Sequence, residues 1–156
     1  MDWVRWAPLG AASLHIVEEF VFPGGFAAWD RRYRSGIANS ITPRLHIIVN
    51  GLLLILCYDA GAWSGTRAGA ALWLTVSALL FSNALWHLRG AIKTRSYSPG
   101  MVTGSLLYIP LTIFGYARFL RSGQASMTTA LIAFAVGGSY HLWAGLLHRR
   151  RAAARG

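Results

Sequence analysis

The sequence is poor in acidic residues and in cysteine, and both shortages limit what the protein can be. Of its 156 residues, only 5 are Asp or Glu and one is a cysteine, Cys57. A single cysteine excludes an internal disulfide framework and a zinc site built from cysteines. Charged residues make up 13% of the chain, whereas a soluble domain typically has about 25%. The low charge, together with a hydrophobic content of 54%, predicts a protein that lies mainly in a membrane.

Long apolar segments set the predicted architecture. A helix that crosses a bilayer needs about 20 mainly apolar residues. Five segments of about that length occur, at residues 4–22, 45–58, 68–88, 101–120 and 126–147. Residues 26–34 are typical of a short interfacial segment, and residues 148–156 form a basic cytoplasmic tail. We therefore predict an all-α integral membrane bundle of about five transmembrane helices, in one domain that spans residues 1–156.

Basic residues outnumber acidic ones, 15 to 5, and their positions predict the orientation. Lys and Arg concentrate in the cytoplasmic loops of membrane proteins. With five spans, eleven of the fifteen basic residues fall on the side of the C-terminus. The N-terminus is therefore predicted outside and the C-terminus in the cytoplasm, in the inner membrane. Because these residues flank the spans in short segments, they suit anionic lipid headgroups rather than nucleic acid.

Both glutamates of the sequence lie inside the first apolar segment, where ionised groups are costly. An ionised side chain at the centre of a span costs about 2.5–3.5 kcal/mol on insertion scales. Glu18 and Glu19 follow His15 by three and four residues. On a helix with 3.6 residues per turn, the three side chains fall within an arc of about 100°. The imidazole and both carboxyl groups can therefore point the same way, which indicates a functional site.

The other apolar segments add polar residues at a similar depth, counted from the predicted cytoplasmic ends. Two of them carry a histidine and an asparagine one helical turn apart. The pattern predicts one polar cavity that opens toward the inner leaflet. The residues expected around it are His15, Glu18, Glu19, His46, Asn50, Asn83, His87, Tyr108 and His141.

One hypothesis for this cavity is a bound metal ion. Imidazole and carboxylate suit zinc or non-haem iron, and helical bundles build such sites from inward-facing Glu and His. The favoured ligands are His15, Glu18 and His141, with His46 or His87 completing the set. An ion with an open position could activate water or polarise a carbonyl or phosphoryl group of a lipid or isoprenoid-like substrate.

In that hypothesis the remaining polar residues act on the substrate. Glu19 would serve as a general acid or base. Asn50 and Asn83 would position the substrate, and Tyr108 is a further candidate catalytic residue.

Two alternatives stay open. In the first there is no metal, and a glutamate that burial keeps protonated acts as the general acid, with its neighbour or a histidine as the base. Isomerisation or cyclisation of an isoprenoid or sterol would suit Glu18 and Glu19 in that case. In the second alternative, the polar groups form a proton or ion path or hold helices together, without chemistry.

The motif His15-Ile16-Val17-Glu18-Glu19 reads His-x-x-Glu-Glu and resembles the HXXEE-domain family of small bacterial membrane proteins. The likeness extends over residues 8–147 and includes Pro23-Gly24-Gly25-Phe26 and Tyr97-Ser98-Pro99-Gly100. The resemblance implies a multi-span helical protein and marks His15, Glu18 and Glu19 as defining residues. It implies no substrate, so the expected mechanism rests on the residues themselves.

Overall fold

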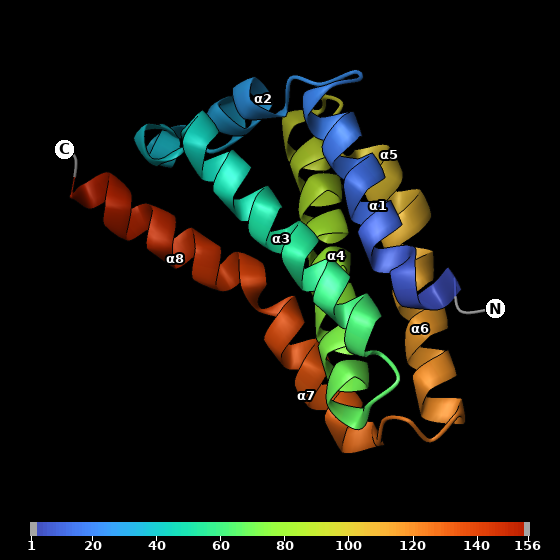
Figure 1. The fold of residues 1–156 in the computed structure, drawn as a ribbon. Coiled ribbons are helices and arrows are strands. Elements are labelled where there is room, and N and C mark those ends of the chain that lie inside the picture. The colour runs from blue at the N-terminus through green and yellow to red at the C-terminus, as the bar shows by residue number, and fades with distance from the viewer. Residues whose placement is uncertain (1–2, 155–156) are drawn as a thin grey trace.

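A computed structural model describes residues 3–154, and within them all regular structure is helical, as predicted. Helix α4 lies in the middle of the bundle and contacts most of the other helices (Figure 1). The elements in chain order are α1 (Trp3–Phe20), α2 (Phe26–Tyr33), the 3-10 helix η1 (Ser35–Ser40), α3 (Pro43–Trp63), α4 (Arg67–Thr94), α5 (Met101–Thr103), the π-helical turn η2 (Gly104–Tyr108), α6 (Ile109–Arg121), α7 (Met127–Gly138) and α8 (Tyr140–Ala153).

Three helical stretches among the described residues are long and apolar enough to cross a membrane, which indicates a membrane protein. They are Pro43–Trp63, Arg67–Thr94 and Met127–Ala153. The other two predicted spans also form helices but are not among these three. Helix α1 has Arg5, Glu18 and Glu19 within its 18 residues. Residues 101–121 are interrupted by the turn η2, so no single long α-helix forms there.

Helix α3 is longer than the predicted segment 45–58 at both ends. The Thr42 hydroxyl accepts a hydrogen bond from the Leu45 backbone N–H at 3.2 Å, which caps the start of the helix. Pro43 occupies the first helical position, where its missing N–H costs nothing. The proline therefore begins the helix, which continues to Trp63.

The predicted segment 126–147 is bent into two helices at Ser139, and α8 turns away from the bundle (Figure 1). Before the bend, α7 packs closely on α4 at Gly137. A Cβ atom at this position would lie 2.1 Å from the Thr75 carbonyl oxygen, so the close approach requires glycine. Beyond the bend, the Ser40 hydroxyl and His148 Nδ1 are hydrogen-bonded at 2.7 Å. Helix α8 is thereby attached to η1.

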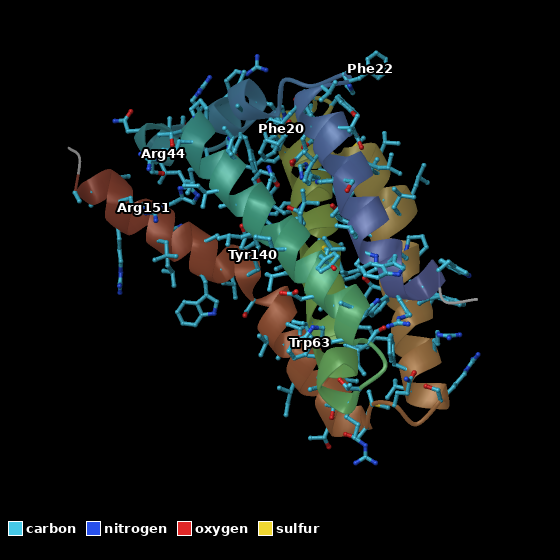
Figure 2. The ribbon with its side chains drawn as sticks, in the orientation of Figure 1. Phe20, Phe22, Arg44, Trp63, Tyr140 and Arg151 are labelled. Carbon is cyan, nitrogen blue, oxygen red and sulfur yellow. The ribbon has the colours of Figure 1, made fainter. Side chains whose placement is uncertain are left out.

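The core of the bundle is built around Trp73 on α4, which is fully buried. The Trp73 indole N–H donates to the Val4 carbonyl oxygen at 3.1 Å, and Gly115 on α6 leaves room for its ring. The outer faces are apolar and exposed, as suits contact with lipid. Arg44 and Arg151 lie toward the end of the molecule where α2 is found, and Trp63 lies toward the other end (Figure 2).

Candidate metal centre

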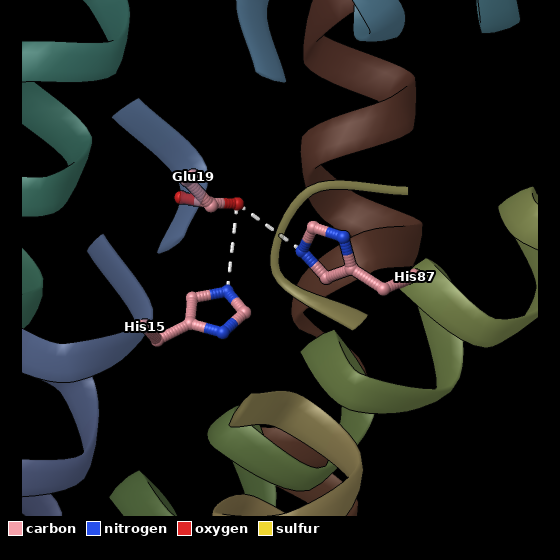
Figure 3. A group of neighbouring side chains, drawn as sticks. All are labelled: His15, Glu19 and His87. Atoms are coloured by element: carbon pink, nitrogen blue, oxygen red, sulfur yellow. Dashed lines mark ion pairs between the residues drawn. The ribbon is translucent and has the colours of Figure 1, made fainter. Parts of the chain in front are cut away.

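Three buried side chains bring potential metal ligands together between α1 and α4. His15 and Glu19 come from α1 and His87 from α4, and one ligand atom of each lies within 4.8 Å of the others. Glu19 Oε1 is 3.4 Å from His15 Nε2 and 3.1 Å from His87 Nε2 (Figure 3). We call His15, Glu19 and His87 the triad. Its three residues are each less than 5% exposed.

Helical spacing explains why these side chains meet. His15 and Glu19 are separated by four residues, so they lie one above the other on the face of α1 that looks toward α4. Glu18 is rotated by about 100° from Glu19 on the same helix and points to a different neighbour. The triad therefore follows from the HXXEE spacing together with the position of His87 near the end of α4.

Hydrogen bonds orient both imidazole rings so that Nε2 faces Glu19. His15 Nδ1 is 2.9 Å from the Thr103 hydroxyl, and His87 Nδ1 is 2.9 Å from the Ser98 hydroxyl. The Thr103 hydroxyl donates to Glu18, so its oxygen is left to accept from the Nδ1–H of His15. This fixes the tautomer of His15 with a lone pair on Nε2.

The ligand atoms of the triad are therefore mainly hydrogen-bond acceptors, and few donors lie close to them. The Asn83 side-chain N–H donates to His15 Nε2 at 3.0 Å. Within residues 3–154, His87 Nε2 has no hydrogen-bond partner, although Glu19 Oε1 is close to it. His87 Nε2 and the Glu19 carboxylate oxygen, 3.1 Å apart, repel one another unless a proton or a metal ion lies between them, and an ion at His15 Nε2 would take the place of the Asn83 N–H.

Glu18 is not part of the triad but anchors the segment 97–103. Its carboxylate accepts the Tyr97 hydroxyl, the Thr103 hydroxyl and the backbone N–H groups of Val102 and Thr103, the latter two at 3.0 and 2.7 Å. Burial and the hydrogen bond to Glu18 raise the pKa of Tyr97 well above its ordinary value, so the phenol remains a donor. The sequence placed Glu18 among the ligands and Glu19 as acid or base, whereas the structure groups Glu19 with the histidines.

Gly100 lets this segment close over the triad. Its φ is +98°, which favours glycine, and an added Cβ would lie 2.7 Å from Cε1 of both His15 and His87. Gly100, Ser98 and Thr103 were missed as site residues from sequence. The signal that could have found the first two was the quartet Tyr97-Ser98-Pro99-Gly100 directly after the helix that carries His87.

The other predicted ligands lie outside the triad. His46 Nε2 is 3.7 Å from a carboxylate oxygen of Asp30, and the His141 ring stacks on Trp86 with 5.5 Å between centroids. The favoured ligand set of His15, Glu18 and His141 is therefore not brought together. Tyr108 packs against the His15 ring at 4.6 Å between centroids, and its buried hydroxyl has no hydrogen-bond partner among the described residues.

A cavity of about 310 Å³ adjoins the triad between α3, α4 and α8. Glu19 belongs to both the triad and the cavity wall. Leu52 also lines the cavity and is 56% exposed, so the cavity is open at that side. A larger apolar groove between α1 and α6, about 410 Å³, has no ionisable residue among the described residues that line it. The predicted polar residues that line the 310 Å³ cavity are Glu19, His46, Asn50, Asn83 and His141.

A buried ion pair lies at one end of this cavity. Asp30 is completely buried, and its carboxylate accepts two hydrogen bonds from Arg34, one of them from Nε at 2.6 Å. Arg34 also lies over the Trp86 ring, 5.2 Å from its centroid. Burial by itself would raise the pKa of Asp30, but contacts with His46 and Arg34 lower it below the ordinary value.

The family model described as a protein of unknown function with an HXXEE motif matches residues 6–115. The chain belongs to the HXXEE family. The matched region contains the whole triad, the anchoring Glu18 and the segment that closes over them, while α7 and α8 lie beyond it. The family assignment made from the motif is thus confirmed. Neither the curated proteins nor the solved structures give a significant match to the chain.

Proposed function

We propose that the protein is a multi-pass membrane enzyme that binds a zinc or iron ion through His15, Glu19 and His87. The ion would act on a lipid or isoprenoid-like substrate in the adjoining cavity. The observation that carries this proposal is the convergence of three buried ligand atoms, each within 4.8 Å of the others.

The chemistry of the triad suits these metals. Two histidines and one carboxylate are the protein ligands of several catalytic zinc sites and of non-haem iron sites that keep coordination positions open. Metal-bound histidines usually donate their other ring N–H to a second residue, which fixes the tautomer. The hydroxyls of Thr103 and Ser98 are placed to accept those N–H groups.

An ion at the triad would face the substrate through Glu19, which reaches the cavity wall. Open positions on such an ion can activate water or polarise a carbonyl or phosphoryl group. Asn50 and Asn83 line the same cavity and would orient the substrate by their amide groups, with the Asn83 N–H released from His15 Nε2 when an ion binds there. Glu18 would be a positioning residue, because it reaches His15 only through the Thr103 hydroxyl.

The proposed setting is the bacterial inner membrane, with five spans, the N-terminus outside and the C-terminus in the cytoplasm. Support comes from the positions of the basic residues, since Arg44 and Arg151 lie toward the same end of the molecule (Figure 2). Basic side chains at that end would contact anionic headgroups of the inner leaflet.

A second candidate function uses a proton in place of the metal. Glu19 lies between two imidazoles and also touches the cavity, so it could exchange a proton between His87 and a bound isoprenoid. That arrangement supports a metal-free isomerase or cyclase.

Metal content separates the two candidates. We expect detergent-purified protein, grown with zinc and iron, to hold about one equivalent of metal by elemental mass spectrometry. His87→Ala should lose it, whereas His148→Ala, a histidine outside the triad, should retain it. Wild-type protein without stoichiometric zinc or iron, or equal metal in both variants, would overturn the metal proposal and leave the proton-based candidate.

A further inference from the structure

Taking the proposed function as its basis, we propose that the substrate is a single-chain amphiphile with an uncharged polar head. It would reach the cavity from the bilayer between α3 and α8. The class includes long-chain alcohols, aldehydes and amides, and excludes free fatty acids and two-chain phospholipids. Three properties of the cavity lead to this substrate class: its opening, its volume and the balance of its charges.

The opening lies between two helices that face lipid. Helix α8 departs from the bundle at Ser139, so the side of α3 that carries Leu52 and Leu56 is left open beside it. Both leucines line the cavity while remaining exposed, and Ala144 on α8 lines it opposite them. An apolar chain can therefore pass from the surrounding lipid into the cavity without crossing water.

The volume suits one chain. Ligand cavities range from about 300 to 1,000 Å³, so this cavity of about 310 Å³ lies at the lower end. A cavity of this volume cannot enclose both acyl chains of a phospholipid, so it suits a molecule that has one chain.

The charges that line the cavity are already balanced inside the protein. Arg34 is paired with the buried Asp30, and Glu19 is paired with two histidines, or with the ion proposed at the triad. A charged head would therefore enter a poorly hydrated site without a counter-charge, and burying an unpaired charge is costly.

The same cavity offers hydrogen bonds to a neutral head. Among the described residues, the Asn50 amide has no hydrogen-bond partner, and neither do the buried atoms His46 Nδ1 and His141 Nε2. Buried polar atoms are normally paired, so the two histidine nitrogens indicate a ligand that supplies the missing partners, and the Asn50 amide is available to the same ligand. A hydroxyl, carbonyl or amide can do so without bringing a charge.

Photo-crosslinking in lipid nanodiscs tests this substrate class. The probes are a long-chain alcohol with a diazirine in its chain and the carboxylic acid of the same length. We expect the alcohol to label peptides of α3 and α8 and the acid to label them at least about tenfold less. Protein treated with a chelator should give the same result, because the inference concerns binding rather than turnover.

Two variants that fill the cavity make the test specific. Ala144→Trp and Val49→Trp place an indole in the cavity, and each should lower labelling by about tenfold or more. Their controls, Leu146→Trp and Ile48→Trp, add the same ring to exposed positions of the same helices and should label as wild type does.

Equal labelling by acid and alcohol would overturn the uncharged head, and labelling that survives both cavity-filling variants would overturn the cavity as the binding site. Neither result depends on a metal. If His87→Ala loses no metal but labelling follows the expected pattern, the metal proposal fails while the substrate class stands.

Discussion

Glu18 and Glu19 are adjacent in the sequence yet contact different parts of the structure. Glu19 faces the two histidines, whereas Glu18 is surrounded by four donors from the segment 97–103. Sequence spacing predicted that both carboxylates and His15 would share a helix face. It could not predict which carboxylate joins the histidines, because that depends on where Tyr97 and Thr103 lie in space.

This division predicts different effects of the two conservative substitutions. Glu19→Gln removes a ligand, so we expect the purified protein to lose its metal, while the melting temperature of the metal-free protein changes little. Glu18→Gln weakens the hydrogen bonds to the segment 97–103, and bonds to charged groups are worth about 1.5–3 kcal/mol. It should lower the melting temperature and reduce metal affinity about 10- to 100-fold, as loss of an outer partner does. Metal titration and thermal unfolding of both proteins test this prediction. Loss of metal in Glu18→Gln together with a lower melting temperature in Glu19→Gln would contradict it.

Gly100 lies against both histidine rings of the triad, so a larger residue there should disturb the site. Gly100→Ala puts a methyl group against both imidazole rings in a backbone conformation that disfavours alanine, at a cost of about 1–2 kcal/mol for the backbone alone. Gly123 also has a positive φ but has open space around it, so Gly123→Ala is a matched control for the backbone cost. We expect only Gly100→Ala to lose metal binding in a zinc titration. Equal zinc affinity in the two variants would show that the segment does not close over the triad.

At the scale of the helices, sequence patterns predicted most elements but not the bend in the last one. The segment 126–147 has continuous hydropathy, and nothing in it marks Ser139 as a break except the preceding Gly137 and Gly138. The bend depends on tertiary contacts, namely the close packing of α7 on α4 and the hydrogen bond between Ser40 and His148. The sequence therefore predicted a polar cavity. It did not predict that the cavity opens laterally, between α3 and α8.

The Asp30 carboxylate holds helix α2 to α3. Protonation of this carboxylate should weaken the contact between the two helices. The lowered pKa of Asp30 means that its contacts with His46 and Arg34 stabilise the fold above the ordinary pKa of 3.8. That stabilisation is lost as pH falls through the lower pKa of the folded state. We expect Asp30→Asn to lower the melting temperature at pH 7, with a difference from wild type that shrinks as pH falls below about 4.

The control for this prediction is Asp59→Asn on α3, which removes the same charge elsewhere. It should lower the melting temperature at pH 7 less than Asp30→Asn does. A difference between Asp30→Asn and wild type that stays constant from pH 7 to acid pH would show that Asp30 is not charged in the folded protein.

At the scale of the whole molecule, composition predicted a helical membrane protein, and the fold agrees. The number of spans was harder to predict, because α1 carries three charged residues and the helical residues 101–121 include a π-helical turn. Hydropathy alone does not report how such helices are held by their neighbours. The orientation rests on the distribution of basic residues and is open to direct measurement.

Single cysteines in a Cys57→Ala background measure that orientation. Gly36 and Gly65 have open space around them, so Gly36→Cys and Gly65→Cys should be accepted without strain. With the N-terminus outside and the proposed spans, a membrane-impermeant maleimide added to spheroplasts should label Gly65→Cys and spare Gly36→Cys until the cells are lysed. The opposite pattern would reverse the orientation.

The proposed function depends on the binding of one metal ion by His15, Glu19 and His87. X-ray absorption spectroscopy of zinc-loaded protein tests it most directly, because it counts imidazole and oxygen ligands around the ion. We expect two imidazoles with nitrogen at about 2.0–2.1 Å and oxygen as the remaining ligands. Any zinc that His87→Ala still binds should have one imidazole. A zinc ion with no imidazole, or with the same two imidazoles in His87→Ala, would contradict it.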